Sequence, residues 1–133
     1  MKNRKIQKGF VSLPVMYLIL SLAFFLLCAF KITPAYIDDN IVKSALIALG
    51  NDPQIDTLSS REIKTKMREK LMRNSIRGEI PEAVKIVNSS KGKFVTVDYV
   101  VRIPVVANID VVVSFQNHLD TSNPAECCKP ASE

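Results

Sequence analysis

An uncharged apolar run of 21 residues, Phe10 to Phe30, constrains this chain of 133 residues more than any other feature. Of the 21 side chains, 18 are apolar, and the three exceptions are Ser12, Pro14 and Ser21. A helix of this length rises about 31 Å at 1.5 Å per residue, which matches the ~30 Å hydrocarbon thickness of a bilayer. The sequence therefore predicts a transmembrane helix over residues 10–30.

The positive charge of the chain gathers at its amino terminus. The net charge is +5, and the first nine residues carry four cations: Lys2, Arg4, Lys5 and Lys8. Because cations beside a span stay on the cytoplasmic side, we expect residues 1–9 to form a cytoplasmic tail and the rest to be exported. In a bacterium this describes an inner-membrane protein with a periplasmic domain. The remaining charge of about +1 gives no support for nucleic-acid binding.

Two other interpretations of the amino terminus remain open beside an uncleaved signal-anchor. A cleaved signal peptide has a basic start, but its apolar region is usually ~7–15 residues long, and the best cleavage position here, after Ala35, is poor. Lys8-Gly9-Phe10 resembles the processing site of type IV prepilins, which would leave a pilin-like subunit after cleavage behind Gly9. Pilins carry Glu at the fifth mature position, where this chain has Pro14.

The stretch after the apolar run predicts a first exported helix. Ile32-Thr33-Pro34 is expected to end the membrane helix, because proline removes a backbone donor and clashes with the preceding turn. Asp38 and Asp39 then fall in the first turn of a new helix, where the helix dipole favours acids. Gly50 and Pro53 close this helix, and its wide apolar face requires a packing partner.

A second exported helix is expected to begin at a capping box formed by Ser59 and Glu62. Its apolar seam consists of Ile63, Met67 and Leu71. Cations border the seam on both sides: Arg61, Lys64, Lys66, Arg68, Lys70, Arg73 and Arg77. One interpretation is a helix on a sheet, with the long cationic stems covering the edges of the seam. The other is a surface for anionic lipid headgroups or for a partner.

From residue 84 onward the apolar side chains alternate with a period of two, which is typical of strands with one buried face. The pattern predicts three strands over residues 84–88, 95–103 and 109–116, with Pro104 ending the second. An antiparallel meander with two helices on one face makes an α+β fold.

The exported α+β domain is predicted to span residues 34–118, enough for one modest core but too few for a deep active-site cleft. Residues 119–133 hold almost no apolar bulk and are expected to form a flexible tail. The tail carries Cys127 and Cys128 in a compartment that permits a disulfide. A disulfide between adjacent cysteines strains the backbone. We therefore expect an intermolecular bridge, two modified thiols or no structural role in preference to a bond between Cys127 and Cys128.

Few residues are suited to catalysis. His118 is the only histidine and falls at the end of the last strand, so neither a histidine-activated nucleophile nor a multi-histidine metal site can be assembled. The acids are explained by helix starts and solvent-facing strand positions: Asp38, Asp39, Asp98 and Asp110. No glycine-rich phosphate loop is present. We therefore expect no catalytic residue, no cofactor and no metal.

Several short segments, taken together, resemble one protein family. They are Lys8-Gly9, Thr33-Pro34-Ala35-Tyr36, Val42-Lys43-Ser44-Ala45-Leu46, Val97-Asp98-Tyr99, Arg102-Ile103-Pro104 and Asn108-Ile109-Asp110. Over roughly residues 8–116 the chain resembles the small single-pass envelope proteins of Gram-negative bacteria grouped as domain of unknown function 4845. Members are often encoded beside signal peptidase I and ribonuclease III, so the resemblance implies a role in the envelope or in secretion. It implies no catalytic or cofactor residue.

The functional prediction is a non-enzymatic inner-membrane protein whose periplasmic domain binds another envelope protein, with signal peptidase or its substrates as the first candidates. The alternative is a pilin-like or pseudopilin-like structural subunit processed after Gly9. Both predictions place the lipid bilayer among the partners of the chain.

Overall fold

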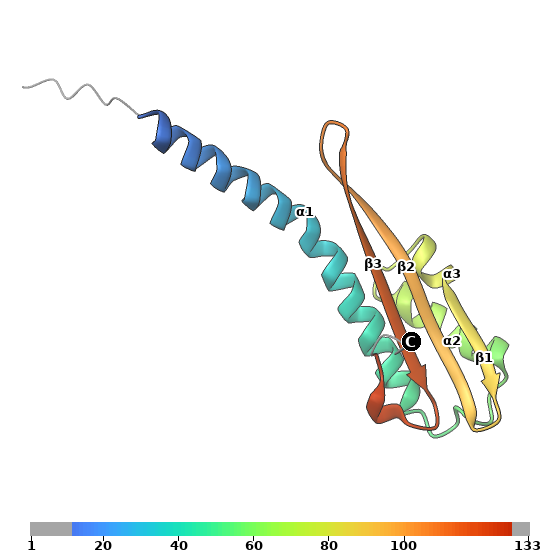
Figure 1. Ribbon diagram of the computed structural model, residues 1–133. Helices are drawn as coiled ribbons and strands as arrows, with labels where there is room; N and C mark the ends of the chain where they lie inside the picture. The colour runs from blue at the N-terminus through green and yellow to red at the C-terminus, as the bar shows by residue number, and fades with distance from the viewer. Residues whose placement is uncertain (1–11, 129–133) are drawn as a thin grey trace, which may run out of the picture.

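The computed structural model describes residues 12–128. Three helices come first along this part of the chain: α1 (Leu13–Gly50), α2 (Ser60–Arg73) and the short α3 (Glu79–Glu82). Three strands and a 3₁₀ helix, η1, follow (Figure 1). The predicted basic tail, residues 1–9, and the processing position at Gly9 lie outside the described residues.

α1 is one helix of 38 residues, so the predicted break at Ile32-Thr33-Pro34 is wrong. Pro34 lies inside the helix. The Thr33 hydroxyl donates a hydrogen bond to the Ala29 carbonyl at 2.6 Å, in the turn where the proline withholds a backbone donor. From Ala35 onward the helix is buried against the sheet, and this packing stabilises helical backbone that local preference alone would interrupt.

The two halves of α1 lie in different surroundings. None of residues 12–30 is buried, and the exposed side chains include Leu20 at 71% and Phe30 at 84%. Among the described residues, α1 is the one helix long and apolar enough to cross a membrane. In Figure 1 its first half stands free and its second half lies along the sheet.

α2 begins where the sequence places it. The Ser59 side chain accepts a hydrogen bond from the Glu62 backbone N–H, and the Glu62 carboxylate accepts one from the Ser59 N–H at 2.7 Å. These two bonds confirm the capping box. The seam residues Ile63, Met67 and Leu71 are fully buried, as a helix packed on a sheet requires. After α2, Gly78 at φ 86° turns the chain into α3.

The sheet is an antiparallel meander in the order β1-β2-β3, as predicted. β1 spans Val84–Ser89, β2 Gly92–Val106 and β3 Ile109–Asp120. β1 reaches only to the pair of Val84 with Val97, so β2 and β3 continue beyond it as a two-stranded hairpin (Figure 1).

The prediction that Pro104 ends the second strand is wrong, because β2 continues to Val106. At Pro104 the strand pairs with β3 alone, since β1 has already ended. A residue without a backbone N–H is tolerated there as it is on an edge strand. The register shifts between Pro104 and Val106, which marks a bulge just before the turn.

The core lies between α1, α2 and one face of the sheet, so the predicted α+β class is confirmed. Its largest fully buried side chains are Leu46, Ile63, Met67, Leu71 and Leu119. The opposite face, here called the open face, carries no helix in the described structure. Its exposed apolar side chains are Val87, Phe94, Val100 and Val112.

The ordered domain extends past the predicted boundary at His118. β3 continues to Asp120, Leu119 is fully buried, and η1 spans Pro124–Glu126. A Cβ placed on Gly50 would come within 2.9 Å of Leu119, so the end of β3 packs closely on the end of α1. Beside Leu119, the buried Thr121 exchanges two hydrogen bonds with the Lys93 backbone, so part of the segment predicted to be a tail contacts the domain.

Candidate functional site

Six of the seven predicted cations lie on α2 around a seam that faces the core, and Arg77 follows the helix. Three of them are ion-paired: Lys66 with Asp52 at 2.9 Å, Arg68 with Glu82 at 2.5 Å and Arg73 with Glu69 at 2.8 Å. The other four pair with no acid among residues 12–128: Arg61, Lys64, Lys70 and Arg77. These four are the free charges that this region offers to a lipid or protein surface.

The burial of the seam limits how α2 meets a membrane. An interfacial helix lies flat with its apolar face in the lipid, whereas here Ile63, Met67 and Leu71 are enclosed by protein. Lys66 lies beside Leu49, and Asn74 lines a recess with Ile37, so α2 runs antiparallel to α1. Its C-terminal end points toward the apolar half of α1. Any lipid contact of this region therefore falls to the cations near that end: Arg73, which is paired with Glu69, and the unpaired Arg77, which follows the helix.

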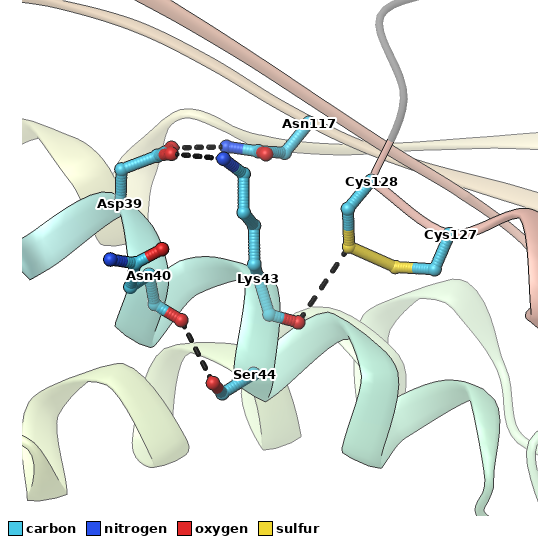
Figure 2. The surroundings of a disulfide bond; sticks show 7 residues. All are labelled: Asp39, Asn40, Lys43, Ser44, Asn117, Cys127 and Cys128. Atoms are coloured by element: carbon cyan, nitrogen blue, oxygen red, sulfur yellow. Dashed lines mark hydrogen bonds and ion pairs between the residues drawn. A yellow bond between two sulfur atoms is a disulfide. The ribbon is translucent and has the colours of Figure 1, made fainter. Parts of the chain in front are cut away.

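The most enclosed polar cluster is built on Asp39 of α1, which is 3% exposed. Its carboxylate accepts a hydrogen bond from Asn117 Nδ2 at 2.7 Å and one from the Tyr99 hydroxyl at 3.3 Å. Lys43, one helical turn further, places its Nζ 2.6 Å from the other carboxylate oxygen. Figure 2 shows Asp39 meeting Asn117 and Lys43 between the helix and the sheet.

Electrostatics fix the roles in this cluster. Burial, followed by the negative charge of Asp39, raises the pKa of Tyr99 above its usual value, so the hydroxyl stays protonated and donates. A buried carboxylate is tolerated only when its oxygens are paired, and here two donors and one cation pair them. This cluster of Asp39, Lys43, Tyr99 and Asn117, here called the polar clamp, therefore fixes which side of α1 faces the sheet.

Sequence reasoning missed this cluster because it placed Asp38 and Asp39 in a first helical turn. With α1 continuous, both lie in mid-helix, and Asp39 falls on the buried stripe with Ala35, Val42 and Leu46. That i, i+4, i+7 spacing was a signal that Asp39 faces the sheet. Its partner Asn117 is 78 residues away, so no local pattern could identify the pair.

The two adjacent cysteines lie beside this cluster (Figure 2). Cys127 and Cys128 are bonded to each other, although the sequence favoured the alternatives to this bond. Cys128 adopts a positive φ of 72°, which accommodates the adjacent pair. Its N–H donates to the His118 carbonyl at 2.7 Å, and its Sγ lies 3.7 Å from the Lys43 carbonyl. These two contacts of Cys128, rather than the bridge between adjacent residues, hold the chain end between β3 and α1.

His118 is half-buried on the open face of the sheet. Its Nδ1 lies 3.1 Å from the Thr96 hydroxyl, and its Nε2 lies 4.0 Å from the Asp98 carboxylate. Within residues 12–128, no group of three His, Cys, Asp or Glu side chains is placed to hold a metal ion.

These features define a class: an α+β domain built directly on the C-terminal half of a helix whose N-terminal half is a candidate membrane span. The family model for a domain of unknown function, DUF4845, matches residues 31–115, more than half of the chain. The chain belongs to that family. The matched segment begins where the apolar half of α1 ends and covers α2, α3 and most of the sheet. No curated protein and no solved structure matches the chain.

Proposed function

We propose that the chain is a non-enzymatic, single-pass protein of the bacterial inner membrane whose periplasmic domain binds another envelope protein. One observation carries the proposal: the folded domain is built onto the same unbroken helix as the apolar segment, with no linker between them. Such a domain is held at the membrane surface in a fixed orientation, which suits a protein that meets a partner in the same bilayer.

The orientation of the chain follows from its flanking charges. Four cations precede the span, Lys2, Arg4, Lys5 and Lys8, and Lys31 alone follows it directly. The positive-inside rule then keeps the amino terminus in the cytoplasm and exports the domain. Reporters fused after residue 128 test this. A reporter that requires export is expected to be active, and a reporter that works only in the cytoplasm is expected to be inactive.

The open face of the sheet is the surface on which we place the protein partner. Val87, Val100 and Val112 are each more than half exposed there, beside charged side chains that include Lys85 and Asp98. Apolar side chains interleaved with charges are typical of interfaces that form and separate. The family that the chain resembles consists of envelope proteins that are often encoded beside signal peptidase. That enzyme is therefore the first partner to examine.

Site-specific photo-crosslinking in cells tests this proposal. A photoreactive residue at Val100, 54% exposed on the open face, is expected to give one discrete adduct with a membrane protein of the envelope. The matched control is Met72 of α2, which is 51% exposed and lies away from that face. No discrete adduct from Val100, or the same adducts from both positions, would contradict the proposal. An adduct with signal peptidase would support the link to secretion.

A pilin-like structural subunit is the second candidate, and the uninterrupted α1 favours it. Copies could bundle through their apolar halves while each domain remains fixed to its own helix. The intact mass of the mature protein distinguishes the two candidates. Loss of residues 1–9 supports the pilin-like subunit, whereas a retained leader excludes processing after Gly9.

A further inference from the structure

The tip of the β2–β3 hairpin lies beside the point where the apolar half of α1 ends. Lys31 directly follows Phe30, and its Nζ donates to the carbonyls of Pro104 at 2.8 Å and Val105 at 3.0 Å. These contacts join the helix to the hairpin over a separation of 73 residues or more. Because α1 is continuous, the tip has a defined height along the helix, at the end of the apolar segment.

Two large apolar side chains of the tip, Val106 and Ile109, are exposed, whereas Val105 is buried. Residues 104–109 contain no charged side chain. Val106 is 46% exposed and Ile109 is 62% exposed, and they face each other across the turn. In Figure 1 this hairpin runs past β1 and α3 alongside α1. Neither α2 nor β1 reaches the tip, so neither element buries these two side chains. Moving them from water into lipid would contribute about 25 cal/mol for each Å² of apolar surface buried.

Apart from Lys31, the charges nearest to the tip lie on the two strands of the hairpin. Arg102 and Asp110 flank residues 104–109, and the Arg102 guanidinium stands 3.9 Å from the Asp110 carboxylate. Two residues of a strand rise roughly 7 Å, so an apolar tip inserted shallowly would leave Arg102 at the level of the headgroups. Asp110 is paired with Pro104 and Arg102 with Val112, so the acid lies one pair nearer the turn than the cation. An insertion limited to Val106, Ile109 and the turn between them keeps this ion pair at the level of the headgroups.

We propose that the hairpin tip, residues 104–109, inserts Val106, Ile109 and the turn between them into the interfacial layer of the bilayer that holds α1. The proposal rests on the membrane anchoring of α1, and it adds a second contact of the domain with lipid. α1 and the hairpin then enter the membrane surface side by side, with the Lys31 ammonium held between them. The domain is fixed at two points and cannot swing about the end of its anchor.

Tryptophan fluorescence of the full chain in vesicles tests the insertion, because the sequence contains no tryptophan of its own. Ile109→Trp is expected to show blue-shifted emission and roughly a two-fold loss of intensity in lipids brominated on the upper acyl chain, since interfacial insertion reaches ~5–10 Å. The matched control is Val87→Trp, which is 60% exposed at the far end of the sheet and should show neither effect. Leu20→Trp, within the apolar half, should be quenched more strongly by lipids brominated deep in the chain.

The outcomes separate the insertion from the anchoring. Emission of Ile109→Trp that matches Val87→Trp, while Leu20→Trp is quenched, would overturn the insertion and leave the anchor in place. Unquenched Leu20→Trp would overturn both. Blue-shifted Ile109→Trp that bromine does not quench, and that reverts on dilution into excess lipid, would show that a second copy of the chain covers the tip instead. Circular dichroism of each variant confirms that the domain is folded, and Val106→Trp provides a second probe of the tip.

Discussion

The two halves of α1 share one unbroken backbone and differ in what surrounds them. In residues 13–30 no side chain is buried, and most are large and apolar. In the second half Ala35, Val42, Leu46 and Leu49 are buried on one side, and polar residues occupy much of the other. Helix formation is therefore common to both halves, while the surroundings differ: the second half packs on the sheet, and the first half is the candidate membrane span.

This comparison predicts that equal substitutions in the two halves have unequal effects. Leu46→Ala opens a cavity in the core, because Leu46 is fully buried, and should lower the free energy of unfolding by about 2–5 kcal/mol. Leu20→Ala, at a site 71% exposed, should change it by less than about 0.5 kcal/mol. Urea unfolding of the full chain in detergent, followed by circular dichroism, measures both. Equal losses would mean that the halves do not differ as described.

A second substitution tests the polar clamp of the buried half. Asp39→Ala leaves the Asn117 amide and the Tyr99 hydroxyl without their acceptor, and should lower the free energy of unfolding by about 2–3 kcal/mol. Asp38→Ala, at the adjacent position, removes the same charge without removing those two bonds and should cost much less. The same unfolding assay compares them. Similar losses for the two variants would show that charge near the sheet matters and the clamp does not.

The junction between the halves is tested at Pro34. Inside a continuous helix, Pro34→Ala restores a backbone donor and should raise the free energy of unfolding by about 1–2 kcal/mol. This is part of the ~3 kcal/mol by which proline is less favourable than alanine in a helix interior. A helix that ended at Pro34 would gain nothing from this change. Pro14→Ala, in the first turn of α1, is the control and should have little effect.

α2 provides a smaller, purely local effect for comparison. Ser59→Ala removes one bond of the capping box and should lower the free energy of unfolding by about 1 kcal/mol. The Ser59 hydroxyl and backbone N–H hold the pKa of Glu62 below its usual value, so the contribution of this carboxylate is present above about pH 4.5 and is lost as the pH falls further. The difference between wild type and Ser59→Ala should therefore shrink in acid. A difference that stays constant from pH 7 to 3 would remove Glu62 from the explanation.

Local signals in the sequence predicted much of this fold. The Ser59 and Glu62 pair located the start of α2, and the alternation of Val95, Val97 and Tyr99 identified the central strand. Each of these signals acts within a few residues, which is the range over which capping and strand periodicity operate. The α+β class and the open face of the sheet both followed from them.

The parts that sequence reasoning could not predict depend on distant contacts. Pro34 and Pro104 were expected to end their elements, and both are overridden: one by packing of α1 on the sheet, the other because β2 has a single neighbour there. Asp39 has its partners in β2 and β3, and Leu119 holds the chain end by packing beside Gly50. The spacing around Asp39 indicated that it faces the sheet, but no local pattern identified its partners or the contact of Leu119 with Gly50.

The absence of a hinge in α1 sets how far the domain can reach. From Lys31 to Gly50 the helix rises about 29 Å, and within residues 31–50 it is unbroken. With the proposed membrane anchoring, the domain samples a thin layer above the bilayer and cannot search more widely on a tether. A partner then has to bring its own surface to that layer, and a soluble protein would meet this domain only at the membrane.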